Sequence, residues 1–227
     1  MSRASMTAKM AYLVAEATNS DQSSFNPDAA VMPRTVHITP PTSTSRLLDL
    51  GEGRLQNRRS VRDIDNGAVT IERVSQIASA AYGYLSNGHR TVPSAGGYYS
   101  LTIHVCKIDG GIIRTVYLFD PDTHSISHIH QISVPLKDGF FVYHVAFERA
   151  TWMLLWSCRL VAPASKYGAK AYRFICFEIG HSAQMAIMEC LEQSLQSIPL
   201  GGLNEKWLRT HVLGENRRLW PHYVLIV

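Results

Sequence analysis

The sequence has 227 residues, 46% of them hydrophobic and 18% charged, which is the balance of a globular protein that can bury one large core or two small ones. Its net charge of +4 is mild, and arginine clusters only at 58–62 and 217–218. This distribution argues against a nucleic-acid surface and favours a local anion-binding site. The apolar runs are far shorter than the roughly 20 residues that cross a bilayer. Residues 1–15 lack the pattern of a secretory signal, so we expect a cytoplasmic protein with no membrane partner.

The first part of the chain differs in composition from the rest. Residues 16–46 are rich in Ser, Thr, Pro, Asn and Asp, and the stretch 38–45 is typical of an extended or linker segment. A short helix is expected ahead of it, over 4–17. Periodic apolar patterns begin only after Arg46. We therefore expect an N-terminal segment, 1–46, that is partly extended or flexible, followed by one domain over 47–227.

The first half of this domain is predicted to contain one helix and three strands. Apolar residues at helical spacing predict a helix over 69–85, with Thr70 as its cap and Asn87-Gly88 as its terminator. Alternating apolar residues predict strands over 99–108, 112–120 and 125–134. The third strand is more polar than the others, so we expect it near an edge of a sheet.

The second half is more apolar. A buried strand is expected over 140–147, a helix over 148–161, a long helix over 172–197 and a shorter one over 203–213, with a strand over 222–227. Helices combined with strands of antiparallel type indicate the α+β class, with a central, mainly antiparallel sheet flanked by helices.

Neither the cysteines nor the histidines predict a cross-link or a metal centre. The four cysteines are scattered through apolar stretches and are interpreted as reduced, buried thiols: Cys106, Cys158, Cys176 and Cys190. Three histidines crowd one predicted strand, with two on the same face: His124, His128 and His130. No carboxylate or cysteine stands at ligand spacing beside them, so no metal is expected.

The first motif with chemical content is Arg58-Arg59-Ser60-Val61-Arg62. Three guanidinium groups within five residues repel one another unless they share an anion. Bidentate arginine donors and a serine hydroxyl suit a phosphate group. The alternative is a solvated basic loop.

The second motif, Pro93-Ser94-Ala95-Gly96-Gly97, connects the predicted helix 69–85 to the strand 99–108. Proline fixes the entry, and two glycines allow the backbone to approach the face of a ligand. The spacing of the two glycines does not match a dinucleotide-binding fingerprint or a P-loop. The alternative is a tight turn.

The third motif is the adjacent pair Lys166 and Tyr167, in a small, polar segment between two predicted helices. A neighbouring ammonium group favours the ionised form of a phenol, so the two side chains can act together as an acid and base. The alternative is a solvated loop with an anchoring tyrosine.

The fourth motif lies on the long helix 172–197. Glu178, His181 and Gln184 follow one another at steps of three, which predicts one polar stripe on an apolar helix. Gly180 inside the helix costs about 1 kcal/mol relative to alanine, which is tolerable if another group packs closely there. The alternative is a hydrogen-bonded structural network.

In this order the four motifs resemble the nitroreductase superfamily, from about residue 36 to residue 227. More narrowly, the sequence is similar to flavin dehydrogenases of the streptolysin and microcin type, which oxidise thiazolines and oxazolines of ribosomally made peptides to azoles. It departs from that pattern at Tyr98-Tyr99-Ser100, where Leu-Tyr-Pro is frequent, and at Met185, where asparagine is usual.

The resemblance implies FMN as the cofactor and gives each motif a role. The phosphate, ribityl chain and pyrimidine edge would be held by Arg58, Arg59, Ser60 and Arg62. The isoalloxazine would lie along Pro93, Ser94, Ala95, Gly96 and Gly97, often across a dimer interface. The helix that carries Glu178, Gly180, His181 and Gln184 would pack near the flavin. The catalytic pair linked to proton abstraction would be Lys166 and Tyr167.

The function expected from the resemblance is FMN-dependent oxidation of azolines to azoles in a precursor peptide that a separate cyclodehydratase has already cyclised. General NAD(P)H-dependent nitro or quinone reduction, and a non-catalytic scaffold subunit of a maturation complex, are the alternatives. The strand 222–227 has no partner next to it in sequence, and exposed strand edges are a liability. We therefore expect its exchange into the sheet of a second subunit, in a homodimer as the family implies.

Overall fold

The computed structural model of the chain describes residues 57–142, 145–214 and 219–227. The expectations for 1–46, the proposed domain start at 47 and the arginines at 217–218 lie outside these residues. In the described parts of the chain, no helix is both long and apolar enough to cross a membrane.

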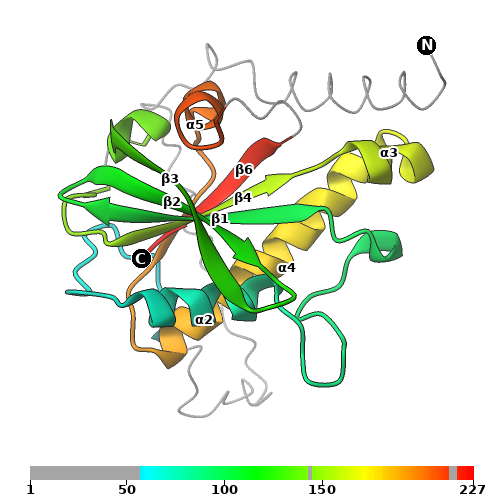
Figure 1. Cartoon of the computed structure of the whole chain (residues 1–227), viewed down its shortest axis with the longest axis horizontal. Coiled ribbons are helices and arrows are strands. Elements are labelled where there is room, and N and C mark those ends of the chain that lie inside the picture. Colours follow the sequence, from blue (N-terminus) through cyan, green and yellow to red (C-terminus); the bar gives the residue numbers. More distant parts are fainter. Residues whose placement is uncertain (1–56, 143–144, 215–218) are drawn as a thin grey trace, which may run out of the picture.

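Six antiparallel strands form one sheet in the order β3-β2-β1-β4-β6-β5 (Figure 1). In chain order they are β1 (Leu101–Asp109), β2 (Ile112–Asp120), β3 (Ser125–Pro135), β4 (Trp152–Cys158), β5 (Ile198–Leu200) and β6 (Trp220–Ile226). The antiparallel sheet, the first three predicted strands and the edge position of β3 are confirmed.

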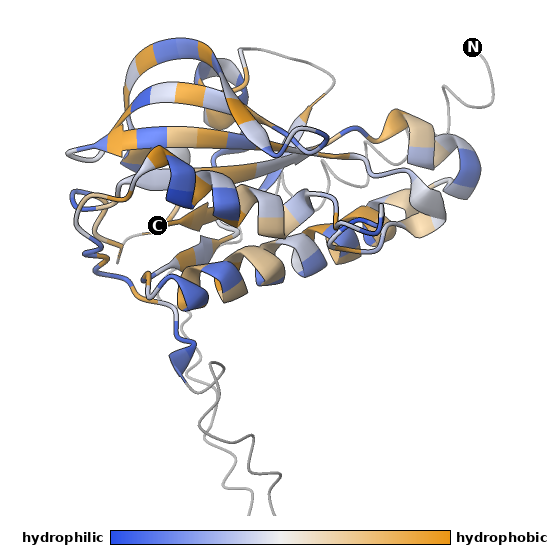
Figure 2. Cartoon of the chain, turned by 60° about the horizontal axis from the view of Figure 1, so that its bottom comes forward, coloured by the Kyte–Doolittle hydropathy of each residue, from blue (hydrophilic) through white to orange (hydrophobic). Residues whose placement is uncertain are grey.

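Helices cover both faces of the sheet. On one face, α2 (Ile71–Tyr82) packs against α4 (Lys170–Glu192), and Figure 2 shows the two helices lying side by side along the sheet. The other face carries α5 (Glu205–His211) and the 3₁₀ helix η4 (Leu136–Gly139). Two short helices complete the fold: η3 (Ala95–Gly97) and α3 (Val161–Tyr167). The α+β class, with helices on both faces of a central antiparallel sheet, is therefore confirmed.

Helix α2 begins where its sequence predicts. Thr70 caps it, because its hydroxyl oxygen accepts a hydrogen bond from the backbone N–H of Arg73 at 3.4 Å. One face of the helix, with Val74 and Ile77, is buried in the core between the helices and the sheet. The helix ends at Gly83, before the predicted terminator, because the chain then turns into an extended loop.

Two predictions in the middle of the chain are wrong. The predicted helix 148–161 is replaced by strand β4, whose seven residues are all buried because β4 lies between β1 and β6 with helices over both faces. A continuous apolar run of this length has no period that separates a buried strand from a buried helix. The described part of 140–147 is not a regular strand and makes only the isolated bridges Phe140↔Leu203 and Asp63↔Ala146.

The reason given for strand exchange is also wrong. Strand β6 pairs with β4 on one side and with β5 on the other, both within the same chain. The predicted long helix ends at Glu192, and β5, which the sequence did not predict, supplies the second neighbour. Strand β6 therefore has a neighbour in the same chain on each side, although β5 pairs only with its last three residues, Val224 to Ile226.

A bulge in the pairing of β2 with β3 separates two histidines predicted to share a face. Val116 pairs with His130, whereas Tyr117 pairs with His128, with a register shift between the pairs. Because Val116 belongs to one core and Tyr117 packs against the other, His130 and His128 lie on opposite faces of the sheet.

The four cysteines are free thiols. Three of them are buried as expected, but Cys176 on α4 is exposed.

Candidate functional site

Helix α4 connects all four sequence motifs. Its 23 residues span about 35 Å at the usual helical rise. The Lys166–Tyr167 pair lies just before its first turn, and the loop 93–97 is bonded to its first half through Glu178. The arginine motif lies beyond its last turn, where the backbone N–H of Val61 donates to the carbonyl of Ser197 at 3.1 Å.

A buried carboxylate holds the glycine-containing loop. The Ser94 hydroxyl donates to Glu178 Oε2 at 2.6 Å, and the Tyr82 hydroxyl donates to the other oxygen of Glu178. The Ser94 oxygen accepts from the N–H of Tyr99 at 3.0 Å, and the Tyr82 oxygen accepts from the N–H of Leu101 at 3.2 Å. This network joins α2, α4 and the entry to β1, so it fixes the loop from both ends.

Burial governs the electrostatics of this network. Glu178 is 4% exposed, and its burial raises the pKa of its carboxyl group, while the hydrogen bonds from Ser94 and Tyr82 act in the opposite direction. Burial and the nearby carboxylate also raise the pKa of the Tyr82 hydroxyl. Tyr82 therefore acts as a hydrogen-bond donor. The sequence analysis missed Tyr82, because the partners are 96 residues apart in the chain.

Arg90 packs against the same network. Its guanidinium carbon lies 4.0 Å from the ring centre of Tyr84 and 4.9 Å from that of Tyr99, and it donates to the carbonyl of Tyr82 at 2.9 Å. Its charge lowers the pKa of both Tyr82 and Glu178, although burial outweighs this effect. The sequence analysis did not select Arg90.

The glycine-containing loop touches the Lys–Tyr pair directly. Gly96 and Gly97 have φ angles of 65° and 68°, in the left-handed region that favours glycine. A Cβ atom on Gly96 would lie 2.5 Å from the Tyr167 hydroxyl oxygen and 3.4 Å from Lys166 Nζ. The structure therefore brings together two motifs that are about 70 residues apart, and only glycine fits between them.

The pair itself lies in a helix and not in the predicted loop. Lys166 and Tyr167 form the end of α3, with Lys166 exposed and Tyr167 half-buried. The Tyr167 ring packs edge-on against Phe174, with ring centres 5.0 Å apart, and Lys166 Nζ lies 5.2 Å from the centre of the Tyr167 ring. Helix packing thus orients the phenol while its charged neighbour faces solvent.

The arginine motif is exposed and positively charged. All four side chains expected to bind phosphate are exposed: Arg58, Arg59, Ser60 and Arg62. In the described residues no carboxylate forms an ion pair with these arginines. The two nearest acids along the chain, Asp63 and Asp65, are both bound by Arg149, at 2.6 and 2.7 Å.

Arg149, which the sequence analysis missed, therefore neutralises the aspartates beside the motif. The side chains of all three residues are more than half exposed, so these ion pairs contribute little to stability. Their effect is on the local electrostatic field, because no carboxylate of the described residues is left to compensate the positive charge of the arginine motif.

The three residues predicted to form one polar stripe on α4 do not share the same degree of burial. Glu178 is buried, whereas His181 and Gln184 are exposed. Gly180 is exposed too, and a Cβ atom there would meet nothing within 4 Å, so no described residue provides the close packing expected at Gly180. Gly180 and Gln184 line a shallow cavity of about 270 Å³ between α4 and β6.

One chain does not bring the arginine motif next to the glycine-containing loop. From Glu178 to Glu192 the helix rises about 20 Å, and the arginine motif lies beyond that end. A single ligand that contacts both must follow the exposed face of α4 past His181 and Gln184, or one of the two groups must come from another copy of the chain.

Sequence and fold define the class of this protein. Residues 55–214 match the sequence profile of the Nitroreductase family, so the chain belongs to that family of oxidoreductases. Members of the family typically bind a flavin. The chain is 29% identical over 180 residues to MJ1384 of Methanocaldococcus jannaschii, a protein assigned by inference as a nitroreductase; the match covers 74% of this chain and 88% of that one.

Solved structures have the same fold. A protein of Ralstonia eutropha, also assigned by inference as a nitroreductase, has a TM-score of 0.63 at 21% identity, covering 76% of this chain and 79% of that one. A chain of the Escherichia coli microcin synthetase McbBCD complex, solved with truncated pro-MccB17 bound, has a TM-score of 0.60 at 15% identity, covering 78% and 72%. At these identities the likeness concerns the fold alone.

Proposed function

We propose that this protein is an FMN-dependent dehydrogenase that oxidises thiazoline or oxazoline rings of a ribosomally made peptide to azoles. The observation that carries the proposal is the contact of Gly96 with Lys166 and Tyr167. It joins an acid–base pair to the loop that the family resemblance assigns to the isoalloxazine. The fold likeness to a chain of a microcin synthetase supports a peptide as the substrate.

The residues present fit an FMN group. The exposed guanidinium groups of Arg58, Arg59 and Arg62 have no ion-pair partner in the described residues, and together with Ser60 they offer the donors that a phosphate requires. At the other end, Gly96 and Gly97 are exposed, and a Cβ atom on Gly97 would meet nothing within 4 Å, so the backbone of this turn is accessible to a ligand. The open space beside Gly180 leaves room for a flat group against α4.

In the proposed reaction the protein supplies orientation and proton transfer. FMN, when bound, accepts the two electrons and the hydrogen that leave the ring. The Tyr167 hydroxyl oxygen takes up the acidic Cα proton of the azoline. The ammonium group of Lys166 stabilises the negative charge that this role requires on the phenol oxygen. Phe174 holds the Tyr167 ring in place.

A second candidate is NAD(P)H-dependent reduction of nitro compounds or quinones, which the similarity to MJ1384 supports. The Lys166–Tyr167 pair favours the azoline reaction. A reductase that takes hydride from nicotinamide has no carbon-bound proton to remove, so it does not require a base at this place.

We further propose that the protein acts as a homodimer with its flavins at the interface, and that its partners are the precursor peptide and a cyclodehydratase. The support for a dimer is the exposed face of α4. Phe177 and Met185 on this face are 56% and 38% exposed, and a Cβ atom on exposed Gly180 would meet nothing within 4 Å among the described residues. Burying this face against a second copy would also supply the group missing at Gly180.

The test of the function is conversion of an azoline peptide to the azole, seen as a loss of about 2 Da per ring by mass spectrometry. We expect Tyr167→Phe and Lys166→Ala to lower turnover about 10²–10⁴-fold and to retain flavin. Arg59→Ala should lose flavin first, because it removes a charge-assisted phosphate contact. Tyr117→Phe, which removes a phenol on β2 away from the loop, is the matched control.

Full activity of both Tyr167→Phe and Lys166→Ala would contradict the proposed mechanism and favour the reductase. The cofactor assignment has its own measurement, which is mass spectrometry of the molecule released by heat. Release of FAD, or failure to retain any flavin after reconstitution, would refute FMN.

A further inference from the structure

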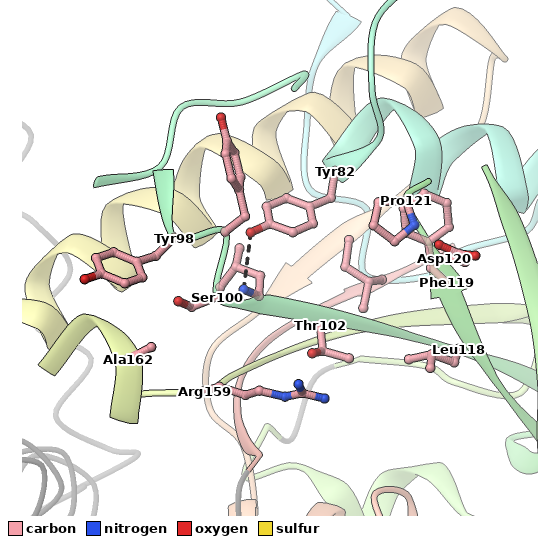
Figure 3. Close-up of a pocket in the computed structure, with 13 residues that line it drawn as sticks. Tyr82, Tyr98, Ser100, Thr102, Leu118, Phe119, Asp120, Pro121, Arg159 and Ala162 are labelled. Carbon is pink, nitrogen blue, oxygen red and sulfur yellow. Dashed lines mark hydrogen bonds between the residues drawn. The ribbon is translucent and has the colours of Figure 1, made fainter. Parts of the chain in front are cut away.

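A cavity of about 390 Å³ lies where strands β1 and β2 diverge (Figure 3). The pairing of β1 with β2 begins only at His104↔Leu118, whereas the residues from Leu101 to Ile103 are registered to β4 alone. The strands therefore separate at this end of the sheet. The space between them is lined by Tyr82, Tyr98, Tyr99, Thr102, Leu118 and Arg159.

The two sides of the cavity differ in chemistry. Tyrosine rings form one side, and Tyr98 is 37% exposed. On the other side of β1, Figure 3 shows the side chain of Arg159 extending past Thr102. A ligand that crosses the edge of β1 left unpaired by β2 therefore meets aromatic surface on one side and a cationic group on the other.

Arg159 is an exposed arginine that directly follows β4. The backbone N–H of Arg159 donates to the carbonyl of Ser100 at 3.0 Å, which fixes where the side chain starts. In the described residues its guanidinium has no hydrogen-bond or ion-pair partner. The acid that lines the cavity, Asp120, accepts hydrogen bonds from Asp122 N–H at 3.0 Å and from the Thr123 hydroxyl at 2.8 Å, within its own turn.

The cavity adjoins the proposed catalytic pair. The Tyr98 ring lines the cavity, and its centre lies 6.2 Å from that of Tyr167 and 6.0 Å from Lys166 Nζ. Ala162, on the same short helix as that pair, lines the cavity as well. A molecule that reacts at Tyr167 can therefore extend past Tyr98 into the space between β1 and β2.

We propose that this cavity binds the peptide segment that flanks the reacting ring, with a carboxylate of the peptide on Arg159 and an apolar or aromatic side chain against Tyr98 and Tyr99. The inference rests on the proposed function in taking a peptide as the substrate. A planar guanidinium binds a carboxylate through two parallel hydrogen bonds, and tyrosine rings offer rigid apolar surface. The carboxylate belongs either to an acidic side chain or to the end of the peptide.

The experiment measures binding directly, so that it does not depend on turnover. One dye-labelled hexapeptide of leucine and serine is made with a free C-terminal carboxylate, with a C-terminal amide, and with the amide plus one glutamate. Fluorescence anisotropy with the flavin-loaded protein should show at least tenfold tighter binding of a carboxylate form than of the neutral peptide. Comparison of the two carboxylate forms identifies the source of the charge.

Variants of Arg159 assign the effect to the cavity. Arg159→Gln should abolish the preference for carboxylate, and Arg159→Lys should restore part of it, because lysine keeps the charge but not the two parallel bonds. Arg114→Gln is the matched control, since Arg114 is an exposed arginine on β2 outside the cavity. It should bind all three peptides like the unmodified protein.

Equal binding of the three peptides, or a preference that survives in Arg159→Gln, would overturn the inference. So would binding of NADPH that depends on Arg159 in place of peptide binding, because the cavity would then serve a nicotinamide cofactor. The proposed function fails separately. If Arg159→Gln converts azolines as well as the unmodified protein and shows the same peptide binding, only the proposed role of the cavity is refuted. If the carboxylate preference depends on Arg159 but no azoline is converted, only the proposed reaction is refuted.

Discussion

Two adjacent glycines carry the same backbone strain but differ in what surrounds them. Gly96 and Gly97 both have left-handed φ angles, yet a Cβ atom on Gly96 would collide with the Tyr167 hydroxyl, whereas one on Gly97 would meet nothing within 4 Å. The difference in stability between alanine variants at these two positions therefore measures the contact between the loop and the Lys–Tyr pair.

We expect Gly96→Ala to destabilise the protein more than Gly97→Ala. Both variants incur the left-handed penalty of about 1–2 kcal/mol, and Gly96→Ala must also displace Tyr167. Urea denaturation of the flavin-free protein measures both changes, with Gly97→Ala as the control for backbone strain. Equal destabilisation would mean that the loop and Tyr167 do not touch.

Two buried histidines make stability depend on pH. Burial lowers the pKa of His104 and of His222 to about 4, from an ordinary value of 6.5. For His104 a second cause is the nearby His130. A group whose pKa is depressed in the folded state contributes stability that is present above its unfolded pKa and is lost as the pH falls through the folded value.

The free energy of unfolding should therefore fall as the pH is lowered from about 6.5 to about 4. His104→Leu should reduce this loss by about 3 kcal/mol, because leucine takes up no proton on unfolding. Exposed His211→Leu is the control. Urea titrations at several pH values give the slope, and an unchanged slope in His104→Leu would show that His104 is not buried as the neutral form.

One buried hydrogen bond couples α4 to the centre of the sheet. Trp156 on β4 donates from Nε1 to the hydroxyl of Ser182 at 2.7 Å, and both residues are fully buried. A second tryptophan of β4, Trp152, donates to the carbonyl of Val69 at 2.9 Å, just before α2. Strand β4 is thus bonded toward both helices that cover it.

Ser182→Ala should destabilise the protein by about 1–3 kcal/mol, because it leaves the Trp156 N–H buried without a partner. Ser165→Ala on α3, an exposed serine bonded to the carbonyl of Ala162, should change stability far less. Chemical denaturation compares the two variants. Equal values would mean that water replaces the Ser182 hydroxyl.

The elements that the sequence predicts well are those with a visible period or cap. Thr70 and the apolar face of α2 specify that helix, and alternation specifies β1 to β3. Strand β4 was missed because every one of its residues is buried, so its pattern contains no polar face. The small residues of α3 gave no helical signal, and the Lys–Tyr pair was therefore expected in a loop.

The candidate site, like the fold, was predicted only where the sequence carries a local signal. Each motif was visible in the sequence because its residues are adjacent or lie within a few positions of one another. The residues that hold the motifs in place were not visible: Tyr82, Arg90 and Arg149. The partners of Tyr82 and Arg149 are brought close by the packing of α2 on α4 and by the path of the chain before α2, which no local pattern records. Arg90 is only eight residues from Tyr82, but it lies in a loop that carries no periodic signal.

The exposed face of α4 that bears Phe177 leads us to expect a dimer. Phe177→Glu should shift the proposed dimer toward monomer and weaken flavin retention, because a carboxylate at 177 would be buried without a partner in the interface. Light scattering at micromolar concentration measures the mass. Ile129→Glu, at an exposed apolar position on edge strand β3, is the control and should leave the mass unchanged. A wild-type protein that is monomeric and active would refute the dimer.

The position of β6 has a consequence for how the protein is made. This strand lies inside the sheet, between β4 and β5, although it is the last element described along the chain. While the ribosome is still synthesising the residues before β6, the buried strand β4 has only β1 beside it, and β5 has no neighbour at all. The sheet can close only when β6 emerges, so the nascent chain exposes apolar strands until then, and aggregation is most favoured in that interval.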